Sequence, residues 1–470
     1  MGDQANRTIL FRFSEYDLYL RRIRRRLATH PRRSSVDRNN GQTQIRPPSG
    51  GHTFSPSSRR GLGGGPKTKM PNRTKIAKVE SMLIGGSDGS PGGHHIVRIW
   101  TEDGTYGVGQ SSCWAYMEAA DAIAKKCGDY LVGKDPSRIE HHWQYMYRMG
   151  PFRGSALSGA ISAVDIALWD IKGKRLDAPV WDLLGGNTRD KIRLHLLMGP
   201  KQKTELPFPH DRGKEAHGLY EAAKESAEAG WTAIKTDPLP NGFESMTLER
   251  LIADTVDNVA AMREGAGKDV DLILEIHRKL TPMNAVALAQ ELEKFHPLFY
   301  EDPIQIDSMV LQGGIAQRTA LPVANGERIH NIWEFRDLLE GGGPQYVRPD
   351  MGLGGGITHV KKIAALAESY HSALATHNFL GPITTCAAIQ VDASIPNFVT
   401  QEYSLRDEHP ANAVFINHHK REGGYMNLPD APGIGIEIDE GLLEVAKTTY
   451  ETRDLNMIPM RTDGSVGYSV

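Results

Sequence analysis

Eight short apolar runs, each followed by a stretch with helical periodicity, fill the middle of this 470-residue chain. The runs are IRLHLLMG, WTAIKTDP, DLILEIH, PLFYEDP, LPVANGE, QYVRPD, ALATHN and NFVTQEY. Short runs that are apolar almost throughout are typical of strands buried on both faces, which occur in parallel sheets covered by helices. The alternation of eight such strands with helices predicts an α/β fold, a (β/α) barrel, over residues 191–410.

Three successive runs of this series end in glutamate. Glu275, Glu301 and Glu327 follow one another at intervals of 26 residues, the length of one strand and helix unit. Because the carboxyl ends of barrel strands share one rim, we expect the three carboxylates to converge there. Carboxylates packed together without a counterion repel one another, and an all-oxygen ligand set suits Mg²⁺. The sequence therefore predicts a Mg²⁺ site at this rim.

Other strand ends carry residues that suit acid–base chemistry. Asp350 ends the sixth run, and His377 ends the seventh, 27 residues later. A carboxylate beside an imidazole fixes its tautomer and raises its basicity, as a general base requires. His277 lies two residues after Glu275 and so faces the same side of an extended strand, while Glu402 ends the eighth run. Asp350, His377, His277 and Glu402 are therefore candidate catalytic residues.

The two ends of the chain differ in charge. Residues 1–70 carry 15 Lys and Arg against 4 Asp and Glu, whereas the whole chain has a formal net charge of -2. The same segment is rich in Ser, Pro and Gly and cannot bury enough apolar surface to fold alone. We interpret residues 1–69 as a disordered basic tail. The alternatives are a basic arm for nucleic acid or a membrane surface, and an organelle presequence, which Asp3, Glu15 and Asp17 weaken.

Residues 70–190 have a different pattern. Strand-like runs from TKIAKVESMLI to HHIVRIWTEDGTYGVGQ surround a Gly-rich turn and contain the hairpin signal Asp103-Gly104. Helical patterns follow in WAYMEAADAIAKKC, SRIEHHWQYMYRM and GSALSGAISAVDIALWDIKGKRL. This segment is predicted to form an α+β domain, and residues 411–470 form a separate C-terminal segment.

Composition excludes several classes of protein. No apolar stretch approaches the ~18 to 20 residues of a transmembrane helix, and no secretory signal pattern opens the chain. The three cysteines are scattered and match no paired metal-ligand spacing. We therefore expect a cytoplasmic protein with no disulfide framework and no membrane partner. We expect no nucleic-acid partner either, apart from the alternative raised for the tail.

The chain resembles the enolase superfamily, and within it the sugar-acid dehydratases, over about residues 72–445. The resemblance rests on GAISAVDIALWDIKGKRLDAPVWDLLGG, the three strand-end carboxylates, RPDMGLGGGITH, and the positions of His377 and Glu402. Within this group, EIH and the spacing of His377 and Glu402 are most similar to galactonate dehydratase. HRKLTP, FYEDP and PNFVTQEY are similar to the mannonate dehydratase branch. The resemblance implies a modified (β/α)7β barrel, a capping domain that NLPDAPGIGIEID completes, and a homo-oligomer.

The resemblance also implies a mechanism. Mg²⁺ would be held by the three glutamates, the first of which is usually Asp in the family, so Glu275 is one methylene longer. His377, oriented by Asp350, would take the proton α to the carboxylate of an aldonate, and His277 would protonate the departing 3-hydroxyl. Glu402 would hydrogen-bond the carboxylate, and the product would be a 2-keto-3-deoxy sugar acid.

Three further residues are expected to bind the substrate. Lys235 and Asp237 end the second barrel strand, and Arg153 lies where cap loops usually determine substrate choice in this family.

Two other functions remain open. A racemase or epimerase on the same scaffold needs bases on both faces of the substrate, and related racemases use Lys-x-Lys on the second barrel strand. Here that strand reads Lys235-Thr236-Asp237, so the second lysine is absent. The other alternative is a non-catalytic sugar-acid-binding or regulatory protein. Retention of the base, the acid and the metal carboxylates argues against it.

Overall fold

Eight parallel strands close into a barrel in the order of the sequence. In this computed structural model, which describes residues 74–89, 93–198, 216–452 and 460–467, each barrel strand pairs with the next and the last pairs with the first. The strands are β4 (Lys191–Leu197), β5 (Ala233–Thr236), β6 (Asp271–Glu275), β7 (Phe299–Glu301), β8 (Val323–Asn325), β9 (Tyr346–Val347), β10 (Ala373–Thr376) and β11 (Phe398–Tyr403). The predicted barrel is confirmed. The predicted tail, residues 1–69, lies outside the described residues.

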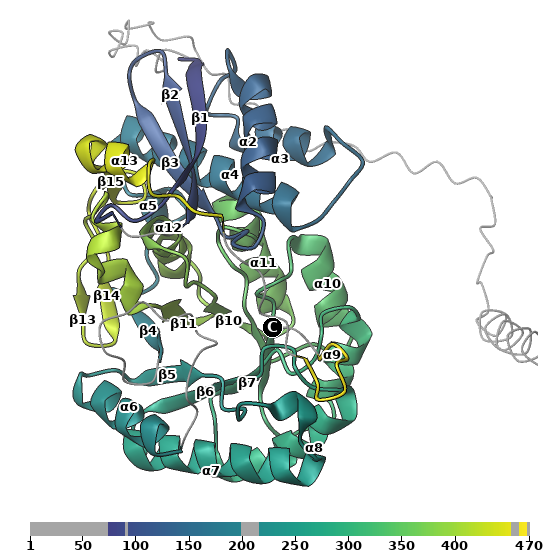
Figure 1. Ribbon diagram of the computed structural model, residues 1–470. Helices are drawn as coiled ribbons and strands as arrows, with labels where there is room; N and C mark the ends of the chain where they lie inside the picture. Colours follow the sequence, from purple (N-terminus) through teal and green to yellow (C-terminus); the bar gives the residue numbers. More distant parts are fainter. Residues whose placement is uncertain (1–73, 90–92, 199–215, 453–459, 468–470) are drawn as a thin grey trace, which may run out of the picture. The chain divides into compact units, whose positions relative to one another are not determined.

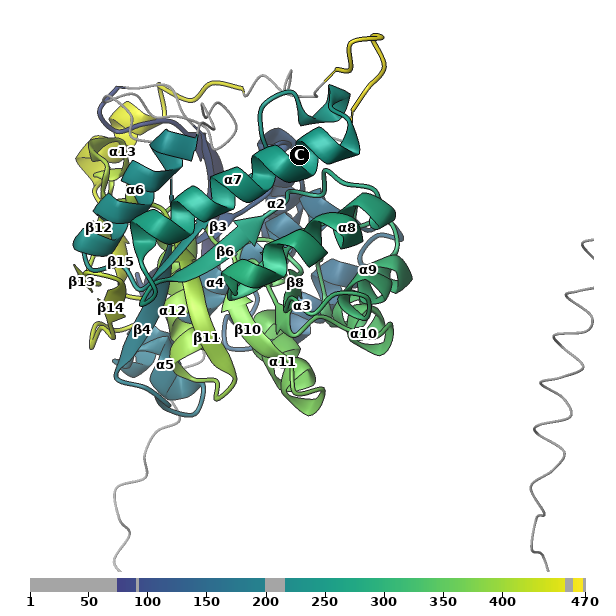
Figure 2. The same ribbon diagram turned by 90° about the horizontal axis from the view of Figure 1, so that it is seen from below.

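Seven helices connect these strands and cover the outside of the barrel (Figures 1 and 2). Four of them begin at a Thr, Ser or Asn whose side chain accepts a backbone hydrogen bond, the usual N-cap arrangement. The helices are α6 (Ala216–Glu228), α7 (Leu248–Ala266), α8 (Pro282–Leu292), α9 (Met309–Ala316), α10 (Ile332–Glu340), α11 (Gly356–Ser369) and α12 (Pro382–Ala393). The 3₁₀ helices η1 (Phe243–Ser245) and η2 (Glu293–Phe295) lie in connections between barrel strands, and η3 (Leu405–Glu408) and η4 (Pro410–Asn412) follow β11.

The interior of the barrel is only partly apolar. Ile273, Phe299 and Ala324 belong to a small apolar cluster contributed by neighbouring strands. Lys235 and Arg348 are among the largest fully buried side chains of the described residues. Because a buried charge without a partner is strongly destabilising, these two cations require buried carboxylates around them.

The capping domain packs a three-stranded antiparallel sheet against helices (Figure 1). Its strands are β1 (Ile76–Ile84), β2 (His94–Thr101) and β3 (Tyr106–Ser111), and its helices are α2 (Met117–Leu131), α3 (Ile139–Arg148), α4 (Ser155–Leu176) and α5 (Val180–Leu183). The predicted hairpin joins β2 to β3, with Gly104 at φ +87°. One face of the sheet packs on the cap helices through Val97 and Ile99, and the other packs on the barrel through Ile96 and Val108.

Two glycines of β3 allow helix α4 to approach the sheet closely. A Cβ atom added at Gly107 would lie 2.1 Å from the carbonyl oxygen of Ala167, and one at Gly109 would lie 1.8 Å from that of Ala163. No side chain fits at either distance. The cap sheet and its longest helix are therefore in backbone contact.

The C-terminal segment returns from the barrel to the cap. β12 (Phe415–Asn417) pairs with β15 (Ile436–Ile438), and the hairpin of β13 (Arg421–Glu422) and β14 (Tyr425–Asn427) pairs with the beginning of β4. Helix α13 (Glu440–Ala446) lies against the cap sheet, where Glu440 forms an ion pair with Arg98. The carbonyl of Ala446 accepts a hydrogen bond of 2.8 Å from Gly85.

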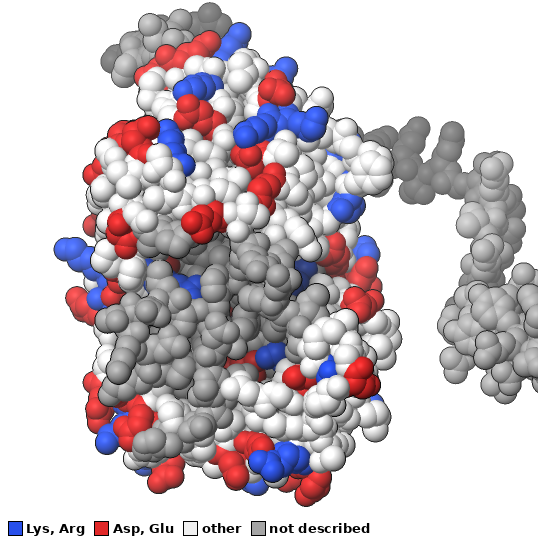
Figure 3. Space-filling view, in the orientation of Figure 1, with Lys and Arg blue, Asp and Glu red and all other residues white. Residues whose placement is uncertain are grey.

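The described surface carries both signs of charge. On the face drawn in Figure 3, Lys and Arg side chains are interspersed with Asp and Glu. Among the described residues, no helix has the length and apolarity needed to cross a membrane.

We expect the substitution Gly109→Ala to destabilise the protein, because its methyl group would overlap the backbone of α4. Overpacking of this kind costs about 1–3 kcal/mol, so the midpoint of thermal unfolding should fall. Gly314→Ala in α9 is the control, since nothing lies within 4 Å of an added Cβ there. Equal unfolding midpoints for the two variants would contradict the close approach of β3 and α4.

Candidate active site

Three glutamate side chains meet at the carboxyl ends of neighbouring barrel strands. Glu275 and Glu301 are the last residues of β6 and β7 and lie opposite each other in the strand register. Glu327 follows the end of β8. All three are buried, and one carboxylate oxygen from each lies within 4.8 Å of the other two.

This cluster suits a divalent cation. Buried carboxylates whose oxygens lie this close together repel one another strongly unless cations lie among them. An all-carboxylate ligand set fits Mg²⁺, which leaves coordination positions to water and substrate. Glu275, Glu301 and Glu327 can therefore hold Mg²⁺.

Two buried cations from inside the barrel share these carboxylates. The ammonium of Lys235 lies 2.7 Å from Glu275 Oε2 and 3.0 Å from Glu301 Oε2. The guanidinium of Arg348 forms ion pairs with Glu301 and Glu402. Lys235 was predicted from the sequence as a site residue, whereas Arg348 was not. Its signal was a charged side chain inside the strand run QYVRPD, directly before Pro-Asp.

The surroundings of Glu301 and Glu402 shift the pKa values of these two side chains in opposite directions. Burial raises the pKa of Glu301 well above its ordinary value, although Arg348 lies against it. Burial also opposes ionisation of Glu402, but the charges around it, with Lys235 foremost at 3.0 Å, hold its pKa well below its ordinary value. Glu402 is therefore a carboxylate that accepts hydrogen bonds from both cations and holds them in place.

His377 and Asp350 lie side by side at the same rim. Nδ1 of His377 is 2.7 Å from Asp350 Oδ2, and Nε2 is 3.2 Å from Glu327 Oε2. Because a carboxylate only accepts hydrogen bonds, Asp350 holds a proton on Nδ1, and Nε2 lies against Glu327 of the glutamate cluster. Nε2 is then the atom that can take a proton from a substrate, next to the glutamate cluster.

His277 lies in a left-handed turn directly after Glu275. His277 and Arg278 have φ angles of +55° and +63°, a conformation that costs non-glycine residues about 1–2 kcal/mol each. The turn is held because His277 N donates to Glu275 Oε1 over 3.0 Å and Arg278 N donates to the carbonyl of Asp302. Burial lowers the pKa of His277, whose Nδ1 lies 3.5 Å from Asp237 Oδ2. Backbone strain of this kind is often found at functional sites.

Arg278 is a second site residue that the sequence analysis missed. Its guanidinium donates to Asp302 Oδ2 over 2.9 Å and forms an ion pair with Glu327. Arg328 adds a further contact of 3.2 Å to Glu327. In the sequence, Arg278 follows a strand end and resembles a solvated side chain, but the left-handed turn directs it inward.

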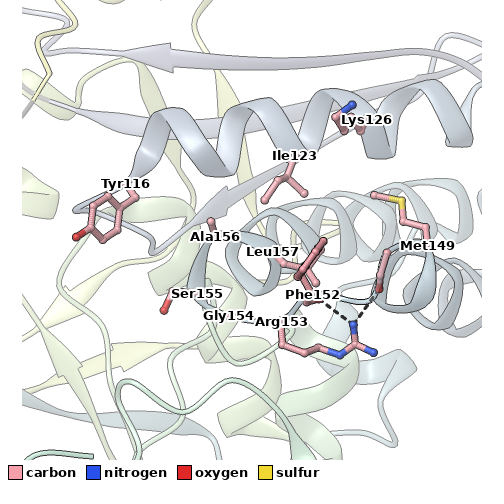
Figure 4. A pocket seen from close by; sticks show the side chains of 11 residues that line it. Tyr116, Ile123, Lys126, Met149, Phe152, Arg153, Gly154, Ser155, Ala156 and Leu157 are labelled. Carbon is pink, nitrogen blue, oxygen red and sulfur yellow. Dashed lines mark hydrogen bonds between the residues drawn. The ribbon is translucent and has the colours of Figure 1, made fainter.

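Arg153 lies in a different place from the other predicted site residues. It lines a cap cavity of about 730 Å³ next to α2, together with the exposed side chains of Tyr116 and Phe152 (Figure 4). Its guanidinium donates to the carbonyls of Gly150 and Phe152 and stacks over the ring of Tyr147. The remaining predicted site residues lie at the barrel rim and are linked to one another by the contacts described above. They are Lys235, Asp237, Glu275, His277, Glu301, Glu327, Asp350, His377 and Glu402.

Comparison with known proteins matches both parts of this architecture. Residues 93–185 match the N-terminal domain of mandelate racemase and muconate lactonizing enzyme, and residues 218–442 match the family described as enolase C-terminal domain-like. The first region covers most of the cap, and the second covers most of the barrel together with part of the returning segment.

Individual relatives are similar over most of their length. The D-galactonate dehydratase of Cronobacter sakazakii is 36% identical over 381 residues, which are 79% of this chain and 95% of the relative. A member of the enolase superfamily from Salmonella Typhimurium has a TM-score of 0.73 at 29% identity, covering 79% of this chain and 98% of its own. An enolase from Agrobacterium radiobacter, with bound sodium and L-malate, has a TM-score of 0.74 at 26% identity, covering 84% of this chain and 100% of its own.

The sequence matches cover the cap and the barrel in one chain, and the D-galactonate dehydratase is 36% identical over 79% of it. This similarity extends through the strand ends that carry the buried carboxylates. The chain therefore belongs to the enolase superfamily, as an enzyme of its dehydratase, or hydro-lyase, group.

Proposed function

We propose that this enzyme dehydrates a sugar acid of the aldonate class, with a galactonate-like stereochemistry. The proposal rests on the position of the His377 imidazole. Its Nδ1 is held by Asp350, and its Nε2 faces the glutamate cluster. A base in this position is suited to remove the proton α to a carboxylate bound at that cluster. The similarity to a relative named D-galactonate dehydratase supports the choice of substrate.

Removal of this proton is difficult because the α-hydrogen of a carboxylate is very weakly acidic, so the site has to stabilise the charge that develops. Mg²⁺ bound by Glu275, Glu301 and Glu327 would act as a Lewis acid toward the substrate carboxylate. Lys235, held by Glu402, supplies a positive charge beside the same position. We assign to Lys235 the binding of the substrate carboxylate and to Glu402 the fixing of Lys235.

Dehydration also needs an acid for the departing hydroxyl. The C–H bond at C2 breaks with its proton going to Nε2 of His377, and the C3–O bond breaks with a proton from His277, releasing water. The resulting enol then becomes the 2-keto-3-deoxy acid. The contact of His277 with Asp237 supports this role, because the carboxylate favours the protonated imidazole and so partly offsets the burial that lowers the pKa of His277.

A substrate screen tests the proposed function. With Mg²⁺, the purified protein should convert galactonate or a close stereoisomer, within a panel of aldonic and aldaric acids, to a 2-keto-3-deoxy product detected with semicarbazide. The same panel in D₂O separates the alternatives. Exchange of the α-proton without loss of water would indicate a racemase or epimerase, and binding without exchange would indicate a non-catalytic protein.

The substitution His377→Asn should strongly lower kcat for dehydration. Loss of a general base typically lowers kcat by about 10²- to 10⁴-fold. His371→Asn is the matched control, because His371 is an exposed histidine with φ +56°, a conformation that Asn tolerates well. A His377→Asn variant that still exchanges the α-proton at the original rate would contradict the assignment of the base.

The substitution Glu275→Gln should weaken Mg²⁺ binding, measured by isothermal titration calorimetry, by at least about 10- to 100-fold. Mg²⁺ should also raise the unfolding temperature of the unaltered protein, since a ligand that binds only the folded state stabilises it. Glu291→Gln on the exposed side of α8 is the control for loss of one carboxylate. Unchanged Mg²⁺ affinity in Glu275→Gln would exclude this cluster as the metal site.

A further inference from the structure

The end of cap strand β3 contacts both barrel loops that carry the Asp350–His377 pair. Nε2 of Gln110 donates to the carbonyl of Leu380 over 3.0 Å, three residues after His377. The backbone N–H of Ser112 donates to the carbonyl of Gly352 over 2.9 Å, two residues after Asp350. Two consecutive barrel loops are thus attached to one short piece of the cap.

The contacts of Gln110 have a fixed direction. Burial lowers the pKa of His94 to about 4, so its ring is neutral at the pH of most cells and has one donor and one acceptor nitrogen. The amide of Gln110 lies 3.0 Å from His94 Nδ1, and His94 Nε2 lies 2.9 Å from Asn412 Oδ1. Since Leu380 offers only a carbonyl oxygen, the NH₂ group of Gln110 has to face it. Rotating the amide by 180° would place two acceptors against each other.

The cap and the two loops are packed without free space at these contacts. A Cβ atom at Gly352 would lie 2.4 Å from Ser112 Oγ, and one at Gly381 would lie 3.0 Å from His94 Cε1. Gly381 also has a φ of +143°, which other residues rarely adopt. A shift of the strand end would therefore displace both loops together.

The loops in turn determine the position of the imidazole. The carboxylate of Asp350 accepts from Gly352 N over 2.7 Å as well as from His377 Nδ1, so the loop after β9 orients the carboxylate. The ring of Phe379, next to Leu380, lies 5.5 Å from the ring of His377 at 66°. Asp350 lies two residues before Gly352, which contacts Ser112, and His377 lies three residues before Leu380, which contacts Gln110.

We propose that Gln110 is a positioning residue that sets the geometry of the Asp350–His377 pair, through its hydrogen bond to Leu380. The cap then places the base in addition to covering the barrel. This inference rests on the proposed function, because it takes His377 as the group that removes the α-proton. Gln110 touches none of the reacting atoms and acts only through the loop.

The test is Gln110→Leu, which keeps a similar volume and removes the donor to Leu380 and His94. A displaced base slows proton abstraction, and misplacement of a catalytic group by ~1 Å costs on the order of 10²-fold in rate. We expect kcat to fall by about 10- to 100-fold while KM changes little. The primary isotope effect measured with α-deuterated substrate should rise, because proton abstraction becomes more strongly rate-limiting.

Ser111→Ala is the matched control. Ser111 is the neighbouring buried residue of β3, and its hydroxyl contacts His95 Nδ1 over 2.8 Å within the cap. The Ser111→Ala substitution should lower the unfolding temperature about as much as Gln110→Leu does, without changing kcat or the isotope effect. If Gln110→Leu lowers only the unfolding temperature, as the control does, the positioning role is wrong.

Gln110→Met covers the case in which the leucine variant does not fold. It keeps the length of the side chain but offers no donor to the Leu380 carbonyl, so the same fall in kcat is expected, and unaltered kcat would again overturn the inference. Failure of the proposed function is recognised separately. In that case the unaltered protein neither exchanges the α-proton nor releases water with any acid of the panel, and both proposals fall together.

Discussion

Burial of charge at the barrel rim is the constraint on which the rest of the structure depends. The oxygens of Glu275, Glu301 and Glu327 lie within 4.8 Å of one another, where carboxylates repel strongly unless cations balance them. Lys235 and Arg348 supply positive charge from inside the barrel. Breaking a buried ion pair costs about 3–5 kcal/mol, so every strand has to be in register for each charge to meet its partner. The same register brings His277, His377 and the three glutamates to one rim of the barrel.

The cap supports the barrel loops that follow β9 and β10. Strand β3 packs on α4 through Gly107 and Gly109 and on the barrel through Val108 and Gln110. Because it is fixed on both faces, its end can restrain loops that would otherwise move independently. The family comparison, which matches the cap and the barrel together, agrees with the two parts forming one functional unit.

The barrel and most of the rim could be predicted from the sequence because both follow from a repeat. Parallel strands bring their carboxyl ends to one edge, so Glu275, Glu301 and Glu327 at equal spacing had to converge. Arg278 and Arg348 have no such pattern. The inward direction of Arg278 depends on a left-handed turn that non-glycine residues seldom adopt, and the burial of Arg348 depends on carboxylates from two other strands. Side-chain contacts between the cap and the loops, such as that of Gln110, depend on tertiary packing and do not appear as a periodic pattern in the sequence.

Closure of the barrel has a consequence for synthesis of the chain. The ring closes where Leu194 of β4 pairs with Gln401 of β11, so nearly the whole barrel has to leave the ribosome before any nascent chain can complete it. Glu402, the partner of Lys235 and Arg348, arrives on that same last strand. Sealing the ring and bringing the last carboxylate to its interior cations are therefore one event. A translation product that stops short of β11 keeps hydrated charges in an open sheet, which makes truncated chains candidates for degradation.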